Sequence, residues 1–199
     1  VDDGSPDGTA QIIQNQMEDY PSRIHLIQRT GKLGLGTAYI TGFKWAIEKG
    51  YSYICEMDCD FSHNPNDLPR LVEACSNGAD MSVGSRYTKG GGVENWPWNR
   101  RWMSKGAGIY VNTVLGLNVK DATAGFVCFK RKVLETIDLD NIQFIGYAFQ
   151  IEMKYKTKKA GYKIQEVPIL FKDRILGQSK MSLNIFNEAF IGVLKMRLG

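Results

Sequence analysis

Short apolar runs rich in β-branched and aromatic residues alternate along this chain with longer segments whose apolar residues recur at helical spacing. The strand-like runs cover residues 23–28, 51–57, 81–85, 126–130 and 164–171. The helical segments cover residues 10–20, 37–49, 65–77, 99–115 and 147–160, with a final one beginning near residue 182. This alternation predicts βαβ units around a parallel sheet, with ligands bound at the carboxyl ends of the strands.

The strand that begins at Tyr51 ends in two carboxylates, Asp58 and Asp60, with Cys59 between them. In an extended backbone alternate side chains point the same way, so both carboxylates are expected to face one spot. Two convergent hard oxygen ligands suit Mg²⁺ or Mn²⁺ carrying a diphosphate. A solvated turn after a strand is the alternative, because D-x-D is a short and common pattern.

Length and composition bound the class of protein. A chain of 199 residues, 43% hydrophobic and 23% charged, predicts one globular domain with its own core. The net charge of +4 gives no case for nucleic acid, and no apolar run approaches transmembrane length. The cysteines lack C-x-x-C spacing, so they indicate buried thiols of a reducing compartment rather than a zinc site or disulfide frame: Cys55, Cys59, Cys75 and Cys128.

Two glycine-rich turns precede helices. The carboxylates of Asp2 and Asp3 stand where a strand would end and could accept hydrogen bonds from a nucleoside, although a helix-capping turn is the alternative. Gly34 and Gly36 open the helix at 37–49. A lone G-x-G is a weak phosphate motif, so tight packing at the helix entrance is the preferred interpretation.

Several cations are placed to bind anions. Arg86, just beyond the strand at 81–85, could clamp a phosphate. Arg174 and Lys180 flank Gly177 in a polar loop and could form a mobile anion clamp. The helix at 147–160 carries a basic set that indicates either a solvated face or an anionic ligand or membrane surface: Lys154, Lys156, Lys158 and Lys159. Glu152 on the same helix is interpreted as a residue that supports the structure and not as part of the site.

An ordered set of motifs is more specific than any single one. It comprises V-D-D-G-S-P-D-G-T, G-L-G-T-A-Y-I, M-D-C-D-F-S-H-N-P, G-S-R-Y, G-Y-A-F-Q-I-E-M and E-V-P-I followed by D-R and G-Q-S-K. This set closely resembles the polyprenyl-phosphate (dolichyl-phosphate) mannose synthases of glycosyltransferase family 2, over essentially the whole chain. The resemblance implies an α/β GT-A (Rossmann-like) fold with a mixed, mostly parallel sheet flanked by helices. It also implies inverting transfer of mannose from GDP-mannose to a polyprenyl phosphate.

The resemblance assigns roles by position. Donor binding would involve Val1, Asp2, Asp3, Asp58, Cys59, Asp60, Arg86, Arg174 and Lys180. Of these, Asp58 and Asp60 would hold Mg²⁺ or Mn²⁺, and the catalytic set would be Asp60, Arg86, Arg174 and Lys180. The family usually has Ala at position 59 and, in many members, a basic residue at position 127, where this chain has Cys and Val.

The resemblance also sets expectations for the surroundings. It implies a single catalytic domain over residues 1–199, whose first strand and helix would lie upstream of residue 1. It implies a peripheral location at the cytoplasmic face of a membrane, with an accessory membrane subunit as a further partner. On the final helix, the face formed by Leu183, Phe186, Phe190 and Val193 is expected to pack on the core rather than on lipid.

The chemistry suits these residues. Negative charge grows on the nucleoside diphosphate as the sugar–phosphate bond breaks, and a metal with arginine and lysine side chains would stabilise that charge. The acceptor phosphate is largely ionised at neutral pH, so no strong general base is required. Two alternatives stay open: a UDP-glucose-dependent polyprenyl-phosphate glucosyltransferase, and a nucleotide-sugar-binding module without turnover.

Overall fold

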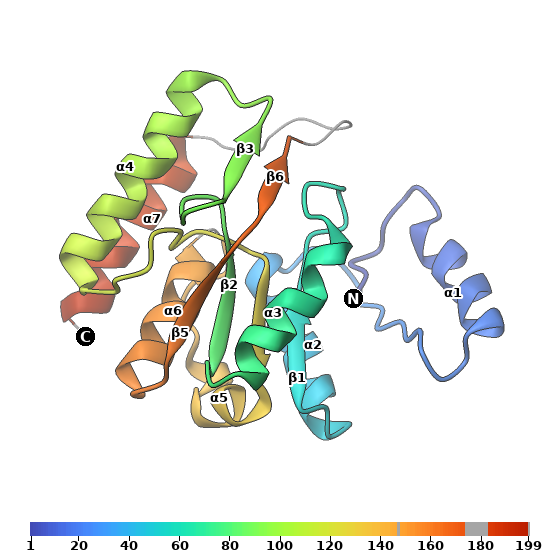
Figure 1. Ribbon diagram of the computed structural model, residues 1–199. Coiled ribbons are helices and arrows are strands. Elements are labelled where there is room, and N and C mark those ends of the chain that lie inside the picture. The colour runs from blue at the N-terminus through green and yellow to red at the C-terminus, as the bar shows by residue number, and fades with distance from the viewer. Residues whose placement is uncertain (147, 174–182, 199) are drawn as a thin grey trace.

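The computed structural model describes residues 1–146, 148–173 and 183–198, with side chains in the last segment described from residue 190 on (Figure 1). The strands are β1 (Tyr53–Glu56), β2 (Met81–Ser85), β3 (Gly92–Glu94), β4 (Val127–Lys130), β5 (Ile164–Pro168) and β6 (Leu170–Lys172). The helices are α1 (Thr9–Asp19), α2 (Leu35–Glu48), α3 (Leu68–Ser76), α4 (Trp98–Leu115), α5 (Arg131–Thr136), α6 (Ala148–Lys159) and α7 (Leu183–Leu198).

The central sheet has the strand order β1-β4-β2-β5. Strand β4 is antiparallel to β1 and to β2, whereas β2 and β5 are parallel, so β1, β2 and β5 run in one direction. The mixed, mostly parallel sheet that the resemblance implied is confirmed. The alternation of elements alone predicted a purely parallel sheet, and that prediction is wrong for β4. The reason is that α4 packs against α7 and does not lead the chain back to the end of the sheet where β2 begins (Figure 1). Strand β4 therefore starts at the end of the sheet where β2 stopped, and it runs in the opposite direction.

Both faces of the sheet are covered. Helix α3 packs on one face, where Leu71 and Cys75 contact Phe126, Cys128 and Val167. Helices α2, α5 and α6 cover the other face. Its buried core is formed mainly by Phe43, Ile54, Met81, Val83, Val127, Phe129, Val133, Leu134, Phe149 and Met153. A third apolar cluster joins α4, α6 and α7 beside the sheet, through Val111, Leu115, Ile151 and Val193.

The strand assignments need three corrections. Residues 23–28 form no strand. Among the described residues, Gln28 makes one isolated bridge, with Asp2, whose N–H binds the carbonyl of Ile27 and whose carbonyl accepts the N–H of Arg29. Residues 92–94, which the sequence analysis assigned to neither a strand nor a helix, form β3, which pairs with β6. The strand predicted at 164–171 divides at Ile169, whose N–H binds the carbonyl of Ser85, and β5 pairs only with β2 among the described strands. Pro168 is the last residue of β5, and β5 lies at the edge of the described sheet, where proline is tolerated.

The prediction of a solvated basic face on α6 is wrong for Lys154, which is fully buried. Its ammonium donates to the carbonyl oxygens of Ala124 at 2.7 Å and Gln150 at 3.2 Å. The structural interpretation of Glu152 is confirmed, because its buried carboxylate accepts the backbone N–H groups of Gln143 and Phe144.

Packing at the entrance of α2 is confirmed as the role of Gly36. A Cβ at this position would lie 2.8 Å from Cδ2 of Phe149 and 3.0 Å from the carbonyl of Phe144. The expectation of buried cysteines holds for Cys75 and Cys128 but is wrong for the other two. Cys55 lies on β1 at the edge of the sheet, beyond the cover of α3, and Cys59 lies in the exposed turn after β1.

Candidate active site

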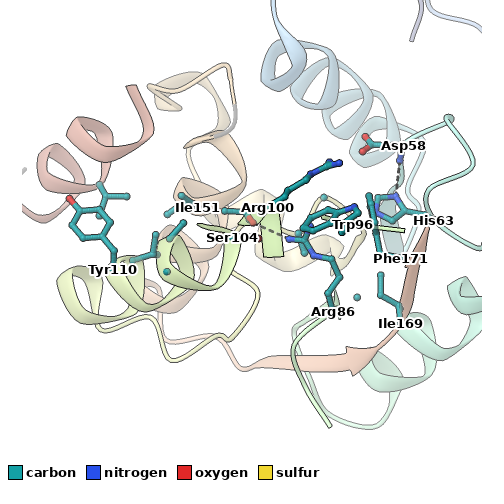
Figure 2. A pocket seen from close by; sticks show the side chains of 18 of the residues that line it. Asp58, His63, Arg86, Trp96, Arg100, Ser104, Tyr110, Ile151, Ile169 and Phe171 are labelled. Carbon is teal, nitrogen blue, oxygen red and sulfur yellow. Dashed lines mark hydrogen bonds between the residues drawn. The ribbon is translucent and has the colours of Figure 1, made fainter. Parts of the chain in front are cut away.

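A pocket of about 410 Å³ opens at the carboxyl ends of β1 and β2 and extends between α4 and α7. Figure 2 shows that Asp58 and His63 lie at one end of it and Tyr110 at the other, with Arg86, Trp96 and Arg100 between. The position agrees with the general rule that ligands bind beyond the carboxyl ends of the parallel strands. The pocket therefore joins a charged end to an apolar end.

The two carboxylates of D-x-D follow β1, but β1 ends at Glu56, so they stand in the turn after the strand. Asp58 lines the pocket, and its Oδ1 accepts a hydrogen bond of 2.9 Å from the hydroxyl of Tyr39. Asp60 accepts the backbone N–H and the hydroxyl of Ser62 at its Oδ1. Burial and the nearby Asp58 carboxylate raise the pKa of Tyr39, so this phenol stays protonated and donates to Asp58.

His63 belongs to this end of the pocket and was missed by the sequence analysis. Its Nδ1 accepts the backbone N–H of Asp58 at 3.3 Å, and its ring packs against Phe126 and Phe171 with centroid distances of 5.0 and 5.3 Å. Burial lowers the pKa of His63. The neutral ring thus fixes the backbone at Asp58. The signal in the sequence was its place five residues after Asp58, in the turn that closes the strand.

Arg86 follows β2 and is held almost entirely by one carboxylate. Its Nε and Nη2 bind the two oxygens of Asp121 at 2.8 and 2.5 Å, and Nη2 also binds the hydroxyl of Thr123 at 3.0 Å. Glu166 on β5 accepts the backbone N–H of Asp121 at 3.0 Å. Burial would lower the pKa of Arg86, but the Asp121 carboxylate more than offsets it, so the pKa is raised. No described residue accepts a hydrogen bond from Nη1, which is left for a ligand.

Helix α4 brings a second arginine into the pocket that the sequence analysis did not select. Arg100 lies over the ring of Trp96 at 4.1 Å, and its Nη1 binds both oxygens of Asp173 at 3.0 and 3.1 Å. Ser104, one turn further along α4, also lines the pocket (Figure 2). The i, i+4 spacing of Arg100 and Ser104 on the predicted helix was the signal available in the sequence.

Two buried donors in this region have no hydrogen-bond partner within the described parts of the chain: Nε of Arg100 and Nε1 of Trp96. Leaving a buried donor unpaired costs about 1–3 kcal/mol, so such groups point to an acceptor that binds there. Anionic oxygens are the natural acceptors beside two guanidinium groups. This part of the pocket is therefore suited to a phosphate.

The far end of the pocket is apolar. Tyr110 on α4 stacks on Phe190 of α7 at a centroid distance of 4.4 Å and donates its hydroxyl to the Phe190 carbonyl. Val111, Ile151 and Val193 complete this wall. The expected core packing of the α7 face is confirmed for Val193, which is buried, whereas Phe190 remains half exposed. The two other members of that predicted face lie where side chains are outside the description.

The N-terminal residues lie outside the lining of this pocket. The Asp2 carboxylate accepts the backbone N–H groups of Gly4 and Ser5, which is the turn-capping role. Asp3 is gripped by Arg29, whose Nε and Nη2 bind its two oxygens at 2.6 Å each and whose Nη1 binds Thr37. The hydrogen bond from Arg29 lowers the pKa of Asp3. Arg29 is thus a third residue, after His63 and Arg100, that the sequence analysis missed.

The remaining expected site residues are distributed as follows. Val1 is half exposed, and Cys59 is exposed between the two carboxylates. Arg174 and Lys180 lie outside the described residues, as does the loop between them. The structure therefore brings together Asp58 and Arg86 from the predicted set and adds Arg100 and His63.

The Glycosyl transferase family 2 model matches residues 1–138 of the chain. This chain belongs to glycosyltransferase family 2. Polyprenol monophosphomannose synthase of Mycolicibacterium smegmatis is 47% identical over 193 residues, which cover 97% of this chain and 73% of that protein. Undecaprenyl-phosphate mannosyltransferase of Micrococcus luteus is 46% identical over 198 residues, which cover 100% of this chain and 81% of that protein.

Solved structures agree on the fold of this family 2 chain. Glucosyl-3-phosphoglycerate synthase from Mycobacterium tuberculosis, in complex with Mn²⁺, UDP and glucosyl-3-phosphoglycerate, has a TM-score of 0.63 and 17% identity. The alignment covers 99% of this chain and 67% of that one. The same enzyme with Mn²⁺ and UDP-glucose has a TM-score of 0.61 and 16% identity, covering 98% of this chain and 66% of that one. The implied GT-A fold is thereby confirmed.

The donor set of this family 2 site fits a hard divalent cation only in part. Asp58 and Asp60 supply carboxylate oxygens, the ligands that Mg²⁺ and Mn²⁺ prefer. Over residues 1–146, 148–173 and 183–198, however, there is no group of three or more His, Cys, Asp or Glu side chains that could hold a metal. A cation here would take its other ligands from water and substrate phosphates, as Mg²⁺ commonly does.

Proposed function

We propose that the chain transfers a mannosyl group from GDP-mannose to a polyprenyl phosphate, with inversion at the anomeric carbon. One observation carries the proposal: the pocket places unpaired donors of Arg100 and Trp96 beside an apolar channel between α4 and α7. A lipid phosphate has the same two parts, an anionic head and an apolar tail. The names of the two relatives, a polyprenol monophosphomannose synthase and an undecaprenyl-phosphate mannosyltransferase, support mannose as the transferred group and a lipid phosphate as its acceptor.

The protein groups divide the work of the reaction. The Nη1 edge of Arg86 and the guanidinium of Arg100 bind phosphate oxygens, which favours the ionised acceptor and neutralises charge in the transition state. An oxygen of the acceptor phosphate attacks the anomeric carbon as the bond to the nucleoside diphosphate breaks on the opposite side. The ionised phosphate needs no base, so His63 is assigned to holding Asp58 and not to proton transfer.

The cofactor is proposed to be Mg²⁺ or Mn²⁺ held by Asp58 and Asp60. When bound, it would neutralise charge on the departing diphosphate. Hydrogen bonds from Tyr39 and Ser62 orient the two carboxylates for this role. The Mn²⁺ in the distant structural relative supports a divalent cation in this fold. Donor contacts by Val1, Asp3, Cys59, Arg174 and Lys180 remain proposals.

The donor is expected to be GDP-mannose in preference to UDP-glucose. Calorimetric titration of the protein with GDP and with UDP, each with Mg²⁺, should show tighter binding of GDP. The decisive assay incubates the chain with each labelled nucleotide sugar and polyprenyl phosphate, then extracts the lipid. Label in the lipid from UDP-glucose alone would favour the glucosyltransferase alternative, and donor binding without transfer would favour a binding module.

We further propose that α4 and α7 dock the enzyme on a membrane surface. No helix in the described part of the chain is both long and apolar enough to cross a bilayer. The two helices lie side by side in Figure 1 and expose apolar side chains next to the pocket. These are Trp98, Trp102, Met103 and Ile109 on α4 and Phe190, Ile191, Leu194 and Leu198 on α7. Arg101 and Lys105 lie among the tryptophans and suit anionic headgroups.

Replacing Trp98 and Trp102 together by serine is expected to weaken binding to anionic phospholipid vesicles roughly tenfold or more, because two aromatic side chains would no longer enter the interface. Their side chains are 77% and 70% exposed, so the fold should be unaffected. Cosedimentation with vesicles measures the effect. Ile12→Ser on α1, at an exposed apolar residue far from α4, is the matched control. Equal loss in the control, or no loss in the double variant, would contradict the docking surface.

A further inference from the structure

Two thiols face each other across neighbouring strands on the side of the sheet that α3 covers. Cys55 on β1 stands directly opposite Cys128 on β4 in the antiparallel register. Residues directly opposite each other have side chains on the same face. A third thiol, that of Cys75 on α3, lies 3.5 Å from the Cys128 carbonyl and donates to it. This group has no part in the proposed transfer reaction.

The hydrogen-bond pattern identifies which kind of pair this is. The N–H of Arg131 binds the carbonyl of Ser52 at 3.0 Å, so these two opposite residues form a hydrogen-bonded pair. Hydrogen-bonded and non-hydrogen-bonded pairs alternate along an antiparallel ladder. Three steps further along, Cys55 and Cys128 therefore form a non-hydrogen-bonded pair. The hydrogen bonds on the other side of β4 agree. The N–H of Lys130 binds the carbonyl of Asp80, the residue immediately before β2, and the N–H of Cys128, two residues earlier, points to the same side, away from β1.

Non-hydrogen-bonded pairs bring side chains closest together. Their Cα atoms are about 4.5 Å apart, within the range of about 4.4–6.8 Å found across disulfides. Cys55 and Cys128 are thus placed so that a bond between their sulfur atoms needs no separation or slippage of the strands. Other described thiol pairs lack this register relation, since Cys75 is on a helix and Cys59 is in a turn.

The two thiols differ in access and acidity. Cys55 is exposed at the edge of the sheet, whereas Cys128 is fully buried. A hydrogen bond from the Cys128 thiol lowers the pKa of Cys55, which raises its thiolate fraction. The thiolate is the reactive form of cysteine. Cys55 is therefore the thiol that reacts with a reagent from solvent, and Cys128 is the neighbouring thiol that can attack the resulting mixed disulfide.

We propose that Cys55 and Cys128 form an oxidisable dithiol, a modification site for low-molecular-weight disulfides. The Cys55 thiolate attacks one sulfur of the reagent, forming a mixed disulfide and releasing one reagent thiolate. Cys128 then gives up its proton and attacks the Cys55 sulfur, which releases the second reagent thiol. In balance, two protein thiols are oxidised to one disulfide while one reagent disulfide is reduced to two thiols. The site is independent of the proposed transferase activity.

The experiment uses the full chain with Cys59→Ala, which removes the other exposed thiol. The protein is incubated with oxidised glutathione, quenched in acid, and alkylated in denaturant before peptide mapping by mass spectrometry. Most molecules are expected to lose two of their three alkylatable thiols and to carry a Cys55–Cys128 cross-link. Dithiothreitol should restore all three. A stable glutathione adduct on Cys55, or a bridge to Cys75, would overturn the proposal.

Two variants make the test specific. Cys55→Ser replaces an exposed side chain, so the protein should fold, and no intramolecular disulfide should form. Cys75→Ser should leave the Cys55–Cys128 bridge in place, because the helix thiol is not needed to form it. Circular dichroism melts of both variants check the fold. If Cys55→Ser still forms a disulfide, or Cys75→Ser fails to form one while remaining folded, the assignment of the pair is wrong.

Discussion

Arg100→Met is expected to lower transfer to polyprenyl phosphate roughly 100-fold at limiting acceptor, because a charge-assisted contact to the acceptor phosphate is lost. Binding of the nucleotide donor should change less than transfer does, because the proposal assigns the acceptor phosphate to Arg100 and the donor diphosphate to Asp58 and Asp60. Figure 2 shows the Arg100 side chain extending from α4 toward the Asp58 end of the pocket, between its charged and apolar ends. Its partner Asp173 is partly exposed, so the carboxylate left behind can be hydrated and the fold should survive. Lipid-extraction kinetics at varied acceptor and calorimetry with GDP separate the two effects.

Arg101→Met is the matched control for this prediction. Arg101 is the next residue on α4 but turns away from the pocket, where its Nη2 binds the carbonyl of Val93. It should keep transfer in detergent solution near the wild-type rate. An Arg100→Met enzyme with a normal KM for polyprenyl phosphate would remove Arg100 from the acceptor site. Equal losses in both variants would indicate a general effect of charge on α4.

Asp60→Asn should reduce turnover at least 100-fold while the protein remains folded. Asparagine keeps an Oδ1 that can accept the two hydrogen bonds of Ser62, so the turn is preserved. What is lost is the negative charge that would hold a divalent cation against the donor diphosphate. Initial rates across a Mg²⁺ and Mn²⁺ titration, together with urea unfolding of both proteins, measure activity and stability separately.

Asp67→Asn provides the control for that substitution. Asp67 follows the same turn but pairs with Arg70 at the surface, where an ion pair contributes at most about 1 kcal/mol. Its turnover and metal dependence should match those of the wild type. Full activity of the unaltered enzyme in excess chelator would disprove the metal proposal, whichever aspartate is changed.

Secondary-structure elements could be predicted from the sequence where the local residue pattern agrees with the place of the element in the fold. The strands at 81–85 and 126–130 and the helix at 99–115 are found within one residue of their predicted bounds. The direction of β4 was not readable from local pattern, because it depends on where α4 packs, and that is decided by residues on α6 and α7 far away in sequence. Residues 23–28 have strand composition but lack a described partner beyond Asp2, and composition alone does not form a ladder.

The site was predicted where a motif marks the end of a strand and missed where side chains converge from separate elements. Asp58 and Arg86 follow β1 and β2 and were found in this way. Arg100 reaches the pocket because α4 packs against α6 and α7, and the local sequence offers only its i, i+4 spacing from Ser104 as a signal. For Lys154 the sequence analysis predicted a solvated side chain, because the neighbouring lysines suggest an exposed basic face. The packing of α6 instead buries it, and its ammonium donates to the Ala124 carbonyl.

The place of β4 in the sheet has a consequence for the order of folding. Strand β1 pairs only with β4 among the described strands, and β4 also separates β1 from β2. A chain emerging from the ribosome therefore holds β1 unpaired until residues 127–130 are available, more than 70 residues later by the numbering of β1 and β4. Such distant pairing closes slowly because the loop entropy is lost before the contacts form. Asp58 after β1 and Gly125 before β4 both line the pocket, so these two parts of its wall come together in one late step. A nascent chain that ends before β4 therefore lacks the pocket.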